Sequence, residues 1–151
     1  IKWEQLIPKG WDPAKEFSDF KLKDLQDSDP RAMELLDRIK QAWDSAPTEP
    51  DLEGARVKLP GFVVPLERQG ELVKEFLLVP YFGACIHSPP PPANQIIHVV
   101  ARQPLKNLQT MSTVWASGTL SLKRSDSPWG ASGYRLAAEV VVPYEAPRKR
   151  K

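Results

Sequence analysis

The sequence has one cysteine, Cys85, among 151 residues, and it contains no Cys-x-x-Cys pair. A single thiol cannot form a disulfide within the chain, so cysteine usage does not separate a reducing from an oxidising compartment. Long hydrophobic runs are also absent, because apolar stretches such as 76–79 are far shorter than the roughly 20 residues that span a bilayer. The chain also lacks the glycine loop that cradles phosphate and the histidine pair of zinc proteases.

The composition is that of a globular domain. Apolar residues make up 41% of the chain and charged residues 26%, which excludes a disordered or membrane-spanning chain. The formal net charge is +2, but the last four residues are all basic, and without them it is −2. A slightly acidic body argues against nucleic-acid binding, which needs a basic face. Proline occurs 16 times, about twice the average usage, and this density excludes an all-helical fold.

The N-terminal third predicts an extended arm followed by a helix. Up to residue 29, apolar residues are scattered among charges without a sustained period, as in a segment laid across a domain surface. Asp29-Pro30 is a typical helix start, with Asp as the N-cap and Pro in the first turn. Apolar residues then recur at helical spacing until Pro47. The predicted segments are an extended arm (1–29), a helix (30–46), a β-barrel domain (52–145) and a basic tail (146–151).

From residue 52 onward the pattern changes to strands. Residues 55–59 alternate apolar and charged, and Gly61 interrupts this first strand as the glycine of a bulge or barrel corner does. Five antiparallel strands with such a bend predict a mainly β fold, a small five-stranded OB-like barrel with one N-terminal helix. A two-layer α+β sandwich is the alternative. The other predicted elements are strands at 74–79, 95–101, 113–123 and 134–142, a hairpin turn at 68–71 and a loop at 125–133.

The segment VPYFGACIHSPPPPANQ, residues 79–95, carries most of the functional argument. Its cysteine, Cys85, stands two residues before His87, one of only two histidines. Residues i and i+2 of an extended segment point the same way, and thiolate and imidazole are both good ligands for zinc or copper. His98, on the next strand, supplies a third ligand if the loop folds back. The pattern therefore indicates a candidate transition-metal site at Cys85, His87 and His98.

Other interpretations of these residues remain open. A lone cysteine is usually buried as a small hydrophobe, and a Cys-x-His pair without further ligands is a weak metal signature. His98 stands between two apolar residues and fits a surface or hydrogen-bonded histidine better than a ligand. Cys85 with His87 as base also resembles the nucleophile pair of a thiol enzyme. Against this, side chains at i and i+2 of a strand lie parallel and do not meet head-on.

The proline run suggests a second role for the segment. Four consecutive prolines hold a loop in a stiff polyproline conformation, which a preorganised site needs. Proline runs also dock into aromatic grooves, but this one stands between an apolar loop and a strand, which favours stiffening. The residues expected to form a loop or partner surface are Tyr81, Phe82, Pro89, Pro90, Pro91, Pro92, Asn94 and Gln95.

The string GACIHSPPPPANQ, with LLVPYFG before it and IIHV after it, resembles a family of exported bacterial proteins of unknown function, mostly from proteobacteria. The opening around Trp3, the segments 61–65 and 114–120, and Gly133-Tyr134 resemble the same family. Its members carry an N-terminal export or lipoprotein signal, so the resemblance implies a periplasmic or envelope location. The chain starts at Ile1, and we expect that an export signal has been removed; a trimmed boundary is the alternative. Family genes often stand beside ABC-type transporter components, some linked to zinc supply, which implies a membrane transporter as partner.

These observations leave three hypotheses. The first is a non-enzymatic periplasmic or envelope binding module, accessory to an ABC-type transporter. Its loop around Cys85 and His87 either binds zinc or another transition metal or contacts the transporter directly. The second is a thiol-dependent enzyme or redox protein that uses Cys85, and the third is a structural adaptor in which Cys85 is packed.

Overall fold

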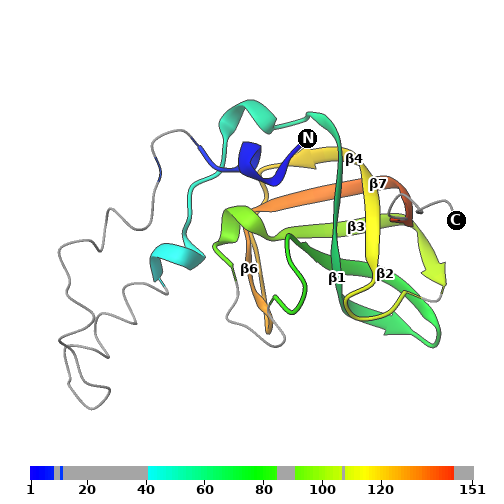
Figure 1. Cartoon of the computed structure of the whole chain (residues 1–151). Helices are drawn as coiled ribbons and strands as arrows, with labels where there is room; N and C mark the ends of the chain where they lie inside the picture. The colour runs from blue at the N-terminus through cyan, green and yellow to red at the C-terminus, as the bar shows by residue number, and fades with distance from the viewer. Residues whose placement is uncertain (9–10, 12–40, 85–90, 107, 145–151) are drawn as a thin grey trace, which may run out of the picture.

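The computed structural model describes residues 1–8, 11, 41–84, 91–106 and 108–144. Their core is a closed barrel of five strands in the order β1-β2-β3-β7-β4 (Figure 1). The predicted mainly β fold with a five-stranded OB-like barrel is confirmed, and the two-layer sandwich is excluded because the sheet closes on itself. The barrel strands are β1 (Arg56–Gln69), β2 (Leu72–Val79), β3 (Ile97–Lys106), β4 (Thr113–Ser121) and β7 (Tyr134–Pro143).

Closure of the barrel requires one parallel pair of strands. Four neighbouring pairs are antiparallel, and a ring of five strands cannot alternate direction all the way round. The parallel pair is β3 with β7, which runs from Ile97 opposite Tyr134 to Ala101 opposite Ala138. The expectation that all five strands are antiparallel is therefore wrong for this one pair.

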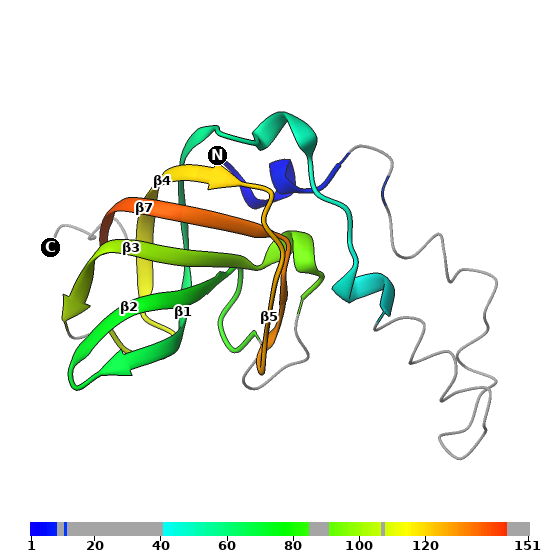
Figure 2. The ribbon, with the colours of Figure 1, turned by 180° about the vertical axis from the view of Figure 1, so that it is seen from behind.

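The segment between β4 and β7 contains a short hairpin where the sequence predicted a loop. Its strands are β5 (Ser125–Ser127) and β6 (Gly130–Ser132), and Figure 2 shows the hairpin standing out from the barrel. The turn-forming residues Asp126, Pro128 and Gly130 lie in or beside the tight turn of this hairpin. These residues predicted the reversal of the chain correctly. They did not predict the three-residue strands on either side of it.

The first strand, β1, bends because it changes partner along its length. Its first half, from Arg56 to Phe62, pairs with β4, and its second half, from Phe62 to Gln69, pairs with β2. Gly61 stands beside this change, as the sequence predicted. A Cβ at Gly61 would lie 2.6 Å from Leu78 Cγ, so only glycine lets β1 approach β2 this closely without displacing a neighbour.

Two apolar clusters stabilise the barrel. Alternate residues of β4 are buried, as a strand with one face toward a core requires. A smaller cluster on the outer side of β1 and β2 contains Val64, Leu77, Val79, Ala84 and Ile96. The fully buried side chains of the main cluster include Leu6, Leu59, Val63, Val73, Phe76, Leu78, Ile97, Val99, Ala116, Leu120, Tyr134 and Leu136.

The described N-terminal residues pack onto the barrel. The 3₁₀ turn η1 (Trp3–Leu6) places Leu6 in the main cluster, and residues 41–44 form a helical turn that is followed by η3 (Pro50–Leu52). Residues 12–29 of the predicted arm, 30–40 of the predicted helix and the tail 146–151 lie outside the described residues. Among the residues that are described, no helix is both long and apolar enough to cross a bilayer.

Candidate functional site

Residues 81–84, which precede Cys85, form a turn on the outer side of the barrel. Ala84 is fully buried in the smaller apolar cluster. Phe82 is 67% exposed, and its ring meets Phe62 edge-on with 5.9 Å between centroids. Tyr81 is also exposed. The residues before Cys85 are therefore anchored at Ala84 while two aromatic side chains remain at the surface.

Four of the predicted site residues, Cys85, His87, Pro89 and Pro90, lie outside the described residues. The structure gives the positions of the residues on either side, Ala84 and Pro91. Within the described ranges, no group of three or more histidine, cysteine, aspartate or glutamate side chains is placed to hold a metal ion. The metal hypothesis therefore depends on residues in the segment 85–90.

The third predicted ligand, His98, lies on β3 opposite Leu77 of β2. Its Nε2 is 2.9 Å from Glu75 Oε1, and its side chain is 13% exposed. A carboxylate that holds one ring nitrogen fixes the orientation of a histidine and directs the other nitrogen elsewhere, an arrangement common around metal-bound histidines. This contact leaves Nδ1 of His98 available as a donor atom.

Beyond the segment, the 3₁₀ turn η4 (Ala93–Gln95) fastens other parts of the chain to the barrel. Asn94 is fully buried, and its Nδ2 donates to the Pro47 carbonyl at 3.0 Å. Its Oδ1 is the one buried side-chain acceptor without a partner among the described residues, and a bound water would satisfy it. Gln95 Nε2 donates to the Trp3 carbonyl at 2.9 Å. Both amide side chains were expected at a partner surface. They instead form hydrogen bonds with N-terminal segments, and Asn94 is not exposed.

A tyrosine at the start of β7 completes this junction. The Tyr134 hydroxyl donates to the Leu6 carbonyl at 2.6 Å and accepts from the Glu49 N–H at 2.7 Å. Burial is the main reason that the pKa of Tyr134 lies above its ordinary value, and the Glu49 N–H opposes that shift. No site role was predicted for Tyr134, because both of its partners are distant in the chain.

The two ends of the Cys85 segment border a groove of about 650 Å³. Pro80 and Tyr81 come before the segment, and Pro91, Pro92 and Gln95 follow it. The described part of the wall is rich in aromatic rings and prolines and contains one carboxylate. The lining residues are Trp3, Glu4, Trp43, Pro80, Tyr81, Pro91, Pro92 and Gln95. Trp3 and Trp43, which were not predicted as site residues, therefore join predicted ones in a single groove, named here the aromatic groove.

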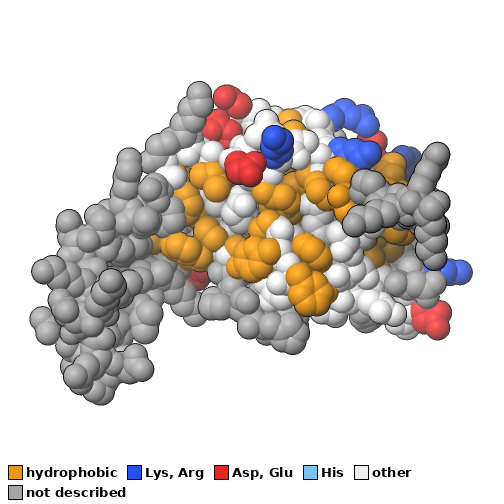
Figure 3. Space-filling model, in the orientation of Figure 1, with side chains coloured by type: hydrophobic (Ala, Val, Ile, Leu, Met, Phe, Trp, Pro, Cys, Tyr) orange, Lys and Arg blue, Asp and Glu red, His pale blue; other side chains and the backbone are white. Residues whose placement is uncertain are grey.

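Hydrophobic side chains also extend over the barrel surface. In the orientation of Figure 3 they form a band across the middle of the molecule. The large apolar residues with the greatest exposure among those described include Phe82, Val140, Tyr81 and Val142. Exposed apolar side chains that gather on one face are typical of an interaction surface.

Comparisons with known proteins place the chain in a family. Residues 3–143 match the family described as "Protein of unknown function (DUF3299)". The crystal structure of a DUF3299 family protein from Pseudomonas aeruginosa PAO1 is similar, with 36% sequence identity and a TM-score of 0.75, over 98% of this chain and 97% of that one. A search of curated proteins found no match. The chain therefore belongs to the DUF3299 family, a family of unknown function.

Proposed function

We propose that this protein is a non-enzymatic binding module and that the aromatic groove is its binding surface. The observation that carries the proposal is the gathering of Trp3, Trp43 and Tyr81 around one groove. Ligand sites are concave and lined mostly by apolar and aromatic groups, and aromatic rings give large contact areas at low entropic cost. Among the lining residues that are described, Glu4 is the one carboxylate and none is histidine, cysteine or serine. This chemistry favours binding over proton transfer or nucleophilic attack.

The partner that we propose is a component of an ABC-type transporter in the bacterial envelope. The support is the resemblance of the GACIHSPPPPANQ string to exported proteins whose genes stand beside such components. A periplasmic or envelope location is part of the same proposal. Residues on both sides of the segment 85–90 line the groove, so a transporter segment seated in it would lie beside the two ends of this segment.

Site-specific photocrosslinking tests this partner. A photoreactive phenylalanine analogue in place of Tyr81 in the full chain, expressed in the cells that make it, is expected to capture a transporter subunit, identified by mass spectrometry. The matched control carries the analogue at Trp129, which is 38% exposed on the turn between β5 and β6. Equal capture at both positions, or capture only of proteins unrelated to transport, would contradict the proposed partner.

A transition-metal site is the second candidate function, and the specific observation in its favour is the contact between Glu75 and His98. One thiolate and two imidazoles, from Cys85, His87 and His98, form a donor set that suits zinc or copper. Glu75 would orient the imidazole of His98. A bound metal would polarise a small molecule that binds to it or link two molecules. Three protein ligands leave one coordination position open for a donor atom from a partner.

Metal content tests this second candidate. Full-length protein purified without chelator is expected to hold near-stoichiometric zinc or copper by mass spectrometry of the metals, and Cys85→Ser is expected to lose it because the thiolate is the strongest donor. The control is Ser88→Ala, which alters the same loop without removing a proposed ligand. Metal-free protein, even after incubation with excess ion, would contradict the site.

The rate of thiol alkylation separates the two remaining hypotheses in that case. A thiol enzyme has a lowered cysteine pKa and reacts fast with iodoacetamide in the native state. A packed thiol in a structural adaptor reacts only after unfolding. Fast native alkylation of Cys85 would therefore favour the thiol enzyme over the structural adaptor.

A further inference from the structure

The barrel wall opens where β3 and β7 separate. Their parallel pairing ends at Ala101 opposite Ala138. Beyond this point β3 bulges: its residues 101–104 stand opposite the single residue Lys74 of β2, because Val100 pairs with Glu75 and Leu105 with Val73. A bulge of this size turns the strand away from its neighbours. Among the described strands, the last part of β7 therefore pairs on one side only, with β4.

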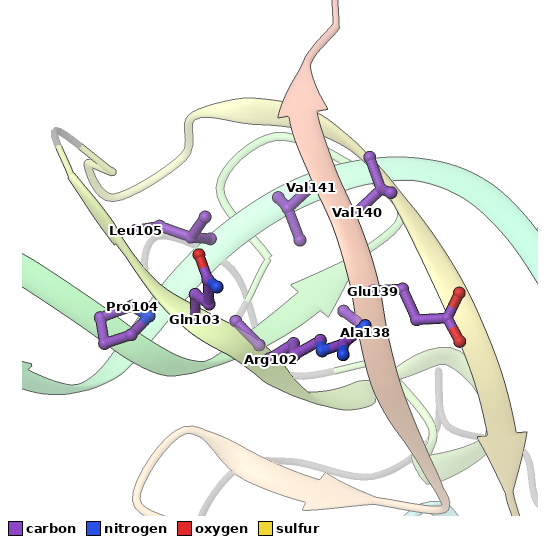
Figure 4. A pocket seen from close by; sticks show the side chains of 9 residues that line it. Arg102, Gln103, Pro104, Leu105, Ala138, Glu139, Val140 and Val141 are labelled. Atoms are coloured by element: carbon purple, nitrogen blue, oxygen red, sulfur yellow. The ribbon is translucent and has the colours of Figure 1, made fainter.

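The space between the two strands is a groove of about 430 Å³, named here the edge groove. This volume lies within the range of ~300–1,000 Å³ typical of ligand sites. Its floor is apolar, because Leu105 and Val141 pack against the barrel core. Figure 4 shows Val141 pointing across the gap toward Gln103 and Leu105, while Glu139 points to the other side of β7. The edge groove shares no lining residue with the aromatic groove.

Along this groove, the backbone of β7 has no partner strand among the described residues. The Tyr144 N–H donates to the carbonyl of Thr113, the first residue of β4. In an antiparallel ladder, bonded and non-bonded pairs alternate, so Val142 and Val140 bond to β4 and the residues between them do not. The N–H and C=O of Val141 and the C=O of Pro143 consequently face the edge groove, as on the open edge of a sheet.

The cations beside the edge groove have no ion-pair partner among the described residues. Arg102 lines it, is exposed and has no ion pair or hydrogen bond with a described residue. Lys106 ends the same strand and is exposed. Among the described lining residues Glu139 is the one carboxylate, and its Oε2 lies 2.7 Å from Nη2 of Arg56. An occupant with negative charge would therefore meet uncompensated cations here.

We propose that the edge groove receives an extended acidic segment of a partner protein, which adds to β7 as an extra strand. The backbone groups of Val141 and Pro143 bond the segment, its alternate apolar side chains cover Leu105 and Val141, and its carboxylates pair with Arg102. This is strand addition to an open sheet edge, in which main-chain bonds give affinity and alternate side chains give specificity. The inference uses a different face from the aromatic groove and does not depend on the proposed function.

A peptide-binding measurement tests this interaction. The probe is a fluorescent octapeptide of alternating valine and glutamate, capped at both ends and titrated with the full chain by fluorescence anisotropy. We expect saturable binding, no binding of the same peptide with N-methylated backbone amides, and weaker binding of the valine–lysine counterpart. Arg102→Glu is expected to weaken binding of the acidic peptide at least about tenfold, because the new carboxylate would repel the carboxylates that Arg102 attracts.

The matched control is Arg124→Glu, which makes the same charge change at an exposed arginine between β4 and β5. It is expected to leave the affinity for the acidic peptide unchanged. Equal weakening by Arg102→Glu and Arg124→Glu would reduce the effect to net charge and overturn the proposal, as would equal binding of the N-methylated peptide. A dimer in sedimentation velocity that Val140→Asp dissociates would also overturn it, because the occupant would then be a second copy of the chain.

Discussion

Replacing Gly118 with alanine is expected to unfold or severely destabilise the barrel. A Cβ at this position would lie 2.0 Å from the Ala137 carbonyl oxygen and 2.9 Å from Ala138 Cα. Both atoms belong to the backbone of β7, so no side-chain rotation relieves the clash. Gly118 stands at a register shift in the pairing of β4 with β7. The expected loss in the free energy of unfolding is at least about 3 kcal/mol, measured as a lowered urea midpoint.

Gly70→Ala is the matched control for this change. Gly70 lies in the turn between β1 and β2 with φ of 60°, and no heavy atom lies within 4 Å of its Cβ position. Its substitution costs only the left-handed backbone conformation, about 1–2 kcal/mol. Equal urea midpoints for the two variants would contradict the conclusion that close approach of β4 and β7 selects glycine at position 118.

The barrel could be predicted because its strands have strong local patterns. The alternation of β4 placed Val114, Ala116 and Leu120 on one face, and all three are buried. The sequence could not show that Gly118, on the same face, serves a contact with β7, because the reason lies in another strand. Nor could it show that β3 continues past Ala101, since the bulge over 101–104 interrupts the alternation from which strands are predicted.

The candidate site was predictable only in part, because side chains that hold distant backbone groups leave no local pattern. The polar residues Asn94 and Gln95 in a proline-rich loop predict an exposed surface. Their actual partners are carbonyl groups of Pro47 and Trp3, which no spacing within the loop reveals. The aromatic groove is similar, since it joins residues from four separate segments of the chain.

Tyr134→Phe is expected to loosen the N-terminal segment from the barrel. The change removes one hydroxyl and leaves the Leu6 carbonyl and the Glu49 N–H, its two partners, without a hydrogen bond. Unpaired buried groups of this kind cost about 1–3 kcal/mol, seen as a lower urea midpoint and faster proteolysis near the N-terminus. Tyr144→Phe is the matched control, because Tyr144 is 38% exposed and its hydroxyl makes no described hydrogen bond. Equal effects of the two variants would contradict the bridging role.

The same variant has a pH dependence whose sign follows from burial. Desolvation raises the pKa of Tyr134 in the folded state above the ordinary value of 10.0. Above that value, the unfolded chain loses the phenolic proton while the folded chain keeps it, so the stability that Tyr134 contributes falls as the pH rises. The difference in unfolding free energy between the wild type and Tyr134→Phe is therefore expected to shrink between neutral pH and about pH 11. A constant difference over this range would mean that the Tyr134 hydroxyl is exposed to water. The hydrogen bonds of Tyr134 with Leu6 and Glu49 would then not form the buried contact that holds the N-terminal residues of the aromatic groove against the barrel.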